Sequence, residues 1–150
     1  MLIQKEEKMR LWHYKLIPFL PDSQLLAQWR ELNSIFKNQP KHILINYVYQ
    51  CPKEDLYLYS LEVLNELKRR NFHVKTMENA WNYFGSLNVN WDKQIFEGYH
   101  NDRYLLQCFM NLQEKFDRGQ QDFSKVDFET MRDFVYKELK VNCLWLDEEL

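Results

Sequence analysis

The side chain in this sequence best suited to acid–base chemistry is Glu31. It falls in a predicted helix over 22–36, about 110° round from an apolar face and on the same flank as Gln24 and Gln28, whereas Arg30 lies on the opposite flank. A carboxylate beside a buried face can donate and accept protons at a bound substrate. A lone helical Glu is more often a solvated surface residue, so the pattern alone leaves both interpretations open.

Several classes of site are not supported by the sequence. The four histidines are scattered, no HExxH pair occurs, and the three cysteines are widely spaced, so no metal site and no cofactor are expected. No serine or cysteine stands in a nucleophile motif. The odd cysteine count fits reduced thiols and a cytoplasmic protein. The four histidines are His13, His42, His73 and His100, and the three cysteines are Cys51, Cys108 and Cys143.

The net charge of −2 hides an uneven distribution. Residues 1–80 carry +3 and residues 81–150 carry −5. A general nucleic-acid binder is usually clearly basic, so any site for a polyanion would be a local patch built mainly from the first half of the chain. No apolar run approaches the roughly 20 residues that a membrane helix needs.

Two adjoining segments position Glu31. An aromatic and basic segment, Arg10–Leu20, here called the arm, contains Pro18 and is followed by Pro21. The helix begins directly afterwards, and Asp22 or Ser23 is expected to cap its first turn. Its apolar residues recur at i, i+4, i+7 and i+11, the period of one helix face: Leu25, Trp29, Leu32 and Phe36.

The rest of the chain predicts a small all-α domain, a compact bundle of about three to four helices with long ordered loops. Further helices are expected over 54–70, from 101 or 102 to Gly119, and over 124–140, and Asn71 is expected to take the left-handed position after the second. The run 42–49 fits a strand or a helical turn, and 72–100 fits loops or short helices. Residues 1–8 read as a flexible extension and residues 9–150 as a single domain.

Three consecutive basic residues, Lys68 to Arg70, close the second predicted helix. They could compensate the helix dipole and point into solvent, or they could form a phosphate patch. The first interpretation is preferred.

Several segments, in order and spacing, resemble the pyrimidine-dimer DNA glycosylases of the phage endonuclease V type. The resemblance spans about Arg10 to Arg118 and is closest to a branch of small bacterial proteins that open with MRLWH. It is carried by the opening MRLWH, by LIPFLPDSQLL, and by LLAQWREL, LKRRNFH and YHNDRYLLQCFMNLQEK.

This resemblance implies a DNA repair enzyme, a glycosylase with AP-lyase activity on pyrimidine dimers or abasic sites. Such enzymes flip a nucleotide out of damaged duplex DNA, attack the sugar C1′ with the amine of their own N-terminus, form an imine and nick the strand by β-elimination. The catalytic residues implied are Glu31, Met9 and Arg30, with Met9 as an alternative start whose amine would be the nucleophile. The DNA-binding residues implied are Arg10, His13, His42, His100 and Lys115. The implied partner is damaged double-stranded DNA. The protein is expected to be a monomer and not to bind a membrane.

Departures from the family pattern leave a second interpretation open. Ser34 and Asn111 stand where arginines are expected, residues 1–8 precede Met9, and the chain ends in the acidic segment WLDEEL. These features favour a non-catalytic DNA-binding or interaction protein that keeps the fold. Trp81 and Trp91, in the region of uncertain structure, are candidates for contact with a base, whereas Trp29 is expected in the core.

Overall fold

The computed structural model describes residues 9–75 and 77–140, and all regular structure within them is helical. The all-α prediction is therefore confirmed. The expected count of three to four helices was too low, because the arm and both uncertain regions contain short helices. The elements are the 3-10 helix η2 (Tyr14–Phe19) and the α-helices α1 (Asp22–Asn38), α2 (Tyr47–Gln50), α3 (Lys53–Arg69), α4 (Glu78–Phe84), α5 (Asp102–Asp117) and α6 (Lys125–Leu139). None of these helices is long and apolar enough to span a membrane.

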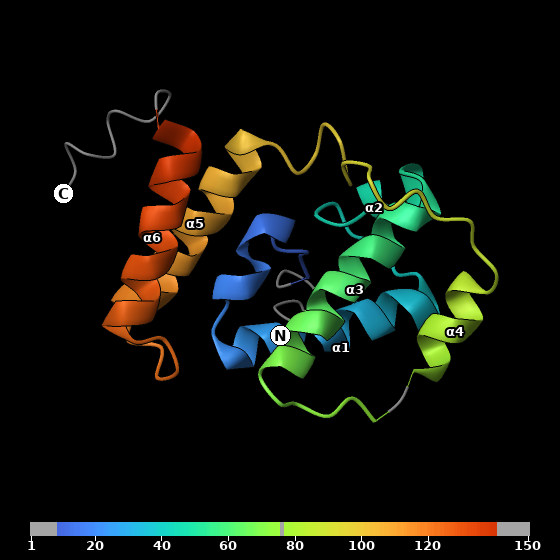
Figure 1. Ribbon diagram of the computed structural model, residues 1–150, viewed down its shortest axis with the longest axis horizontal. Coiled ribbons are helices and arrows are strands. Elements are labelled where there is room, and N and C mark those ends of the chain that lie inside the picture. The colour runs from blue at the N-terminus through green and yellow to red at the C-terminus, as the bar shows by residue number, and fades with distance from the viewer. Residues whose placement is uncertain (1–8, 76, 141–150) are drawn as a thin grey trace.

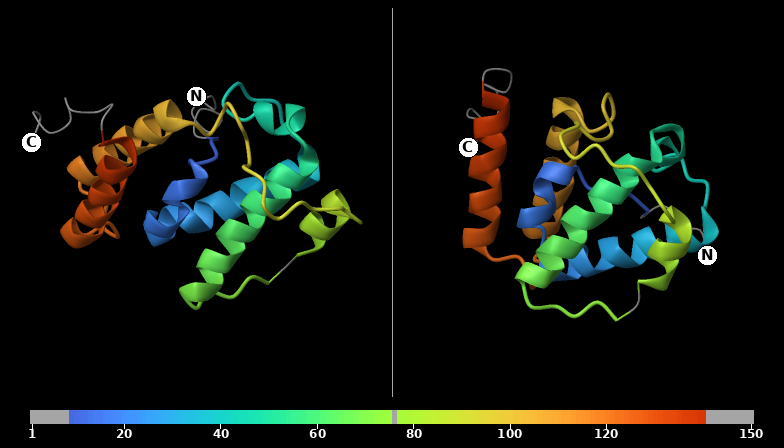
Figure 2. Two further views of the ribbon diagram at one scale, coloured as in Figure 1. Left: turned by 45° about the horizontal axis from the view of Figure 1, so that its top comes forward. Right: turned by 45° about the vertical axis from the view of Figure 1, so that its right-hand side comes forward.

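The arm lies between two groups of helices (Figures 1 and 2). Helix α1 packs against α3 and α4, and α5 packs against α6, while η2 contacts α3 on one side and both α5 and α6 on the other. Two apolar side chains of η2, Leu16 and Ile17, are at most 1% exposed, so the arm forms part of the core. The two groups therefore meet largely through the arm.

Helix α1 begins as predicted, but a different residue caps it. Pro21 holds the N-cap position without a side-chain hydrogen bond, so the expected cap by Asp22 or Ser23 is wrong. The Ser23 N–H instead donates to the Asp122 carboxylate over 2.7 Å. The Asp22 carboxylate forms an ion pair with Arg70 at 2.8 Å. A carboxylate distant in sequence thus satisfies an orphan amide of the first turn.

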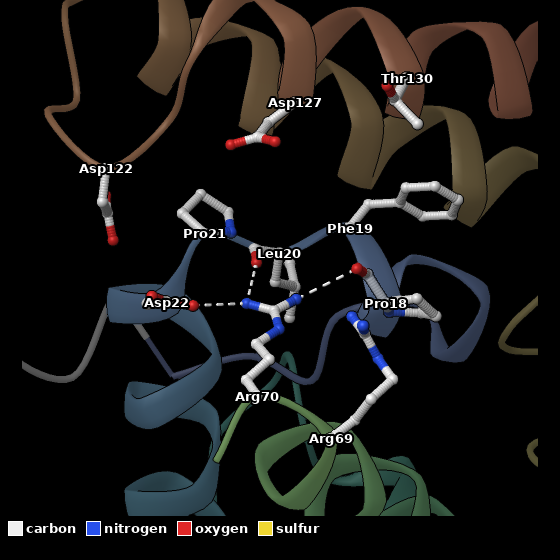
Figure 3. A pocket seen from close by; sticks show the side chains of 10 residues that line it. All are labelled: Pro18, Phe19, Leu20, Pro21, Asp22, Arg69, Arg70, Asp122, Asp127 and Thr130. Atoms are coloured by element: carbon white, nitrogen blue, oxygen red, sulfur yellow. Dashed lines mark hydrogen bonds and ion pairs between the residues drawn. The ribbon is translucent and has the colours of Figure 1, made fainter. Parts of the chain in front are cut away.

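Arg70 fastens the end of α3 to the arm (Figure 3). Its guanidinium donates to the Leu20 carbonyl at 2.7 Å and the Pro18 carbonyl at 3.1 Å, in addition to its ion pair with Asp22. It also donates to Glu66 at 2.7 Å. The predicted solvation of this basic triplet is therefore wrong for Arg70, whose side chain is 16% exposed, whereas that of its neighbour Arg69 is 66% exposed.

The loop before α5 is held to α3 by a buried acidic residue. Asp55 pairs with Lys93 at 2.5 Å and accepts the Phe96 N–H at 3.0 Å. Phe96 has a left-handed φ of 50° and is fully buried, so its side chain anchors the loop in the core. Its fixed path brings His100 and the start of α5 against the arm.

The remaining helix ends agree closely with the sequence. Asn71 has φ 66°, the left-handed conformation expected after α3. Asn101 caps α5, where its side chain accepts the Tyr104 N–H, and Ser124 caps α6 in the same way. The run 42–49, which fitted a strand or a helical turn, is a turn followed by α2. The predicted flexible extension 1–8 and the acidic tail lie outside the described residues.

Candidate active site

A pocket of about 400 Å³ opens between the two groups of helices, beside the arm. It unites three residues that the sequence singled out, Arg10, Glu31 and Lys115. The arm, α1 and α5 each contribute to its walls. The lining residues are Arg10, Trp12, Gln24, Ala27, Glu31, Asn111, Glu114 and Lys115.

The Glu31 carboxylate faces the backbone of the arm. Its Oε2 accepts the Arg10 N–H at 3.4 Å and the Gln28 amide at 3.2 Å. Burial raises the pKa of Glu31 to about 7, although the Arg10 N–H and the charge of Arg30 act in the opposite direction. A carboxyl group that titrates near neutral pH can serve both as an acid and as a base.

Met9 lies one residue before the amide that contacts Glu31. Its half-buried side chain packs against the core. Consecutive backbone nitrogens are about 3–3.6 Å apart, so the Met9 nitrogen lies within about 7 Å of the Glu31 carboxylate. An amine at this position would have to approach Glu31 more closely, directly or through bridging water, to exchange a proton with it.

Arg30 and Lys115 differ in their relation to this pocket. Lys115 is half-buried in the α5 wall, on the opposite side from α1. Arg30 is exposed on the other flank of α1 and does not line the pocket, as the helix period predicted. Its influence on Glu31 is electrostatic, since its positive charge lowers the pKa of that carboxyl.

His13, within the arm, and His100, just before α5, are both buried, 1% and 2% exposed. The Tyr14 N–H donates to His100 Nδ1 at 3.2 Å, and His100 Nε2 lies 2.7 Å from the Tyr47 hydroxyl. Burial lowers the pKa of His13 to about 4 and that of His100 to about 2, so both rings are neutral at neutral pH. Their contacts fix the arm, and neither ring is presented at the surface.

His42 is separate from the pocket. Its Nδ1 accepts the Leu44 N–H at 3.2 Å, and its own backbone N–H donates to Asn46 at 2.8 Å, so it stabilises the turn before α2. The structure therefore does not bring His42 to Glu31.

The two tryptophans proposed for base contact are exposed, but neither lines the Glu31 pocket. Trp81 on α4 is 69% exposed, and Trp91 in the following loop is 66% exposed with its ring 6.3 Å from that of Tyr57. Trp29, expected in the core, is half-buried and packs against it.

The two positions that depart from the family pattern differ in location. Asn111 lines the pocket from α5, next to the exposed carboxylate of Glu114. Ser34 is half-buried on α1, one turn beyond Glu31, and is not part of the lining. Where the resemblance led us to expect an arginine, at position 111, this pocket therefore offers a neutral amide.

Sequence reasoning missed the role of Gln28. The helix period placed it beside Glu31 but gave no sign that its amide is buried and bonded to the arm.

Within the described residues, no group of three His, Cys, Asp or Glu side chains could hold a metal ion. Cys51 and Cys108 are free thiols.

The fold and the pocket define a small helical protein with a carboxylate held against the backbone of its arm. Residues 9–79 match the family model described as pyrimidine dimer DNA glycosylase, which confirms the family resemblance over this part of the chain. The match contains Met9, Arg10, Arg30, Glu31 and His42, whereas the α5 wall of the pocket lies beyond it. No curated protein and no solved structure gives a significant match.

Proposed function

We propose that this protein is a DNA repair glycosylase with AP-lyase activity that acts on pyrimidine dimers or abasic sites in double-stranded DNA. The observation that carries the proposal is the Glu31 carboxylate, which lies 3.4 Å from the Arg10 N–H inside the segment that matches the glycosylase family. We further propose that residues 9–150 act as one cytoplasmic, monomeric domain without a cofactor.

The proposed reaction starts from an unprotonated α-amine, which has a pKa near 8 and so is partly free at neutral pH. The amine attacks the sugar C1′ as the bond from C1′ to the base (or to the hydroxyl of an abasic sugar) breaks. The C1′–O4′ bond of the sugar ring then opens, with the proton taken from the amine passing to O4′, and a protonated imine remains. Glu31 gives a proton to the leaving group and takes one back from the amine. Removal of a C2′ proton then breaks the C3′–O bond and nicks the strand.

The DNA would reach this pocket through its charged walls. Arg10 and Lys115 stand on two sides of it and can contact backbone phosphates. Arg30 would act through its charge on Glu31. Because His13 and His100 are buried, we propose that they serve DNA binding by holding the arm, and that His42 acts at a separate contact. A damaged base stacks and pairs poorly, so flipping it costs less than flipping an intact base.

The second candidate is a DNA-binding protein without catalysis. It is favoured by the α5 wall of the pocket, where Asn111 is uncharged and the Glu114 carboxylate is paired with Arg118 at 3.2 Å rather than replaced by a cation. This candidate predicts binding to abasic duplex DNA without any covalent product.

Borohydride trapping separates the two candidates. The full chain and a version beginning at Met9 would each be incubated with a duplex that carries one abasic site or one cyclobutane dimer, and the cross-linked peptide would be mapped by mass. The enzyme proposal predicts an adduct at the Met9 amine of the shorter chain, or at the Met1 amine of the full chain. A folded protein that binds the duplex but gives no adduct in either version would contradict it.

A further inference from the structure

The amide of Gln28 connects the carboxylate of the pocket to the backbone of the arm. Its Nε2 donates to the Arg10 carbonyl at 3.0 Å and to Glu31 Oε2 at 3.2 Å. Its Oε1 accepts the Trp12 N–H at 2.8 Å and lies 2.7 Å from the Tyr59 hydroxyl. The side chain is 1% exposed and thus uses the full hydrogen-bonding capacity of a primary amide without help from water.

The partners of this amide fix its orientation. Exchanging its oxygen and nitrogen would point the NH₂ group at the Trp12 N–H and the C=O group at two oxygens, those of Arg10 and Glu31. The Tyr59 hydroxyl would tolerate the exchange, because its proton can turn to the Trp12 carbonyl, which is also 2.7 Å away. The Trp12 N–H is fixed in direction and would not. Trp12 therefore determines which end of the amide faces Glu31.

One group thus sets two positions at once. The arm is held at residues 10 and 12, on both sides of the fully buried Leu11. The same NH₂ group that binds the arm also binds the carboxylate, and Gln28 is one turn before Glu31 on a rigid helix. A displacement of the arm relative to Glu31 would therefore strain the bonds of this amide to residues 10 and 12.

We propose that Gln28 is the positioning residue of this pocket and that its amide keeps the Glu31 carboxylate at a fixed distance from the backbone of the arm. Its consequence for catalysis rests on the proposed function, because the amine that would attack DNA extends from this same backbone. The positioning itself is a property of the free protein and can be measured without DNA.

The first experiment uses the full chain, labelled at its glutamate carboxyl carbons, and follows the titration of these carbons by NMR over a pH series. Gln28→Met keeps the side-chain length and removes all four bonds. Because the amide stabilises the charged form of Glu31, its loss is expected to raise the pKa of Glu31 by about one unit. The Trp12 amide resonance should move as well, since its acceptor has gone.

Two further variants separate positioning from a general loss of stability. Val135→Ala removes packing from α6, which does not line the pocket, and is expected to leave the Glu31 titration unchanged. Gln28→Asn keeps a buried amide but shortens it by one methylene, so it should shift the titration in the same direction by a smaller amount. If Gln28→Met fails to fold, Gln28→Asn decides the question in its place.

An unchanged Glu31 titration and an unchanged Trp12 resonance in a folded Gln28 variant would overturn the proposal. The catalytic consequence is read in the same full-length variants as the single-turnover rate of borohydride trapping at saturating abasic duplex. We expect a fall of about tenfold with unchanged DNA affinity. If the wild-type protein forms no adduct, the proposed function fails, while the titration still decides whether Gln28 positions Glu31.

Discussion

Burial raises the pKa of Glu31 to about 7, whereas the same carboxyl in an unfolded chain titrates near 4.5. Between these values the folded chain keeps a proton that the unfolded chain has released. The free energy of unfolding therefore falls as the pH rises through this window, by about 2–3 kcal/mol in total. An ionised Glu31 thus lowers stability at neutral and basic pH, as is common for groups placed for chemistry.

Replacing Glu31 with a neutral isostere should remove this cost. We expect Glu31→Gln to raise the free energy of unfolding by about 2 kcal/mol at pH 8 and to leave it unchanged at pH 4, where the carboxyl is protonated in both states. The titrations of His13 and His100 are common to both proteins and cancel in the difference. Urea unfolding at the two pH values measures it, and a difference that does not vary with pH would contradict the burial argument.

For the individual residues of the pocket, the sequence predicted the helix face on which Glu31 lies but not the hydrogen bonds that Glu31 makes there. The period of α1 put Gln28 on the flank of Glu31, and the structure shows them in contact. The bonds from Gln28 to Trp12 and Tyr59 join three separate elements. Local pattern carries no information on such contacts, because they depend on how the elements pack.

The element that most affects the geometry of the pocket is the arm, and its attachment to α3 can be tested at Arg70. Arg70→Met would remove the bonds to the Pro18 and Leu20 carbonyls and leave the buried Glu66 with a single cationic partner. We expect a loss of about 3 kcal/mol in the free energy of unfolding. Urea denaturation at pH 7 provides the measurement.

Arg69→Met is the matched control for this prediction. Arg69 precedes Arg70 and also pairs with Glu66, but its side chain is 66% exposed. The expected loss is below about 1 kcal/mol, because the Arg69 side chain is largely in water and Arg70 still neutralises Glu66 after the substitution. Equal effects of the two substitutions would show that Arg70 does not anchor the arm.

The long helices were predictable because their apolar periods are regular and their caps are local. Asn101 and Ser124 cap α5 and α6 from within the same stretch of sequence. The capping of α1 was not predictable in the same way, because the amide of Ser23 is satisfied by Asp122 from the loop before α6. The run 42–49 stayed undecided since a short apolar stretch has no distinguishing period.

In the whole molecule, the pocket forms where two groups of helices meet across the arm. Glu31 comes from α1, and Lys115 and Asn111 come from α5, which the sequence treated as separate elements. The family match ends at residue 79, so the α5 wall of the pocket is known only from the structure. Because the α5 wall carries Lys115 beside the neutral Asn111 and a Glu114 that pairs with Arg118, we propose that contacts with phosphate are few and local.

We propose that Glu31 performs proton transfer at DNA bound in this pocket. The most direct test is strand nicking of a duplex with one abasic site by Glu31→Gln, with Glu62→Gln, an exposed carboxylate on α3, as the control. We predict that Glu31→Gln loses nicking by at least about a hundredfold while duplex affinity is retained, and that the control nicks at the wild-type rate. Nicking by folded Glu31→Gln at the wild-type rate would contradict the assignment.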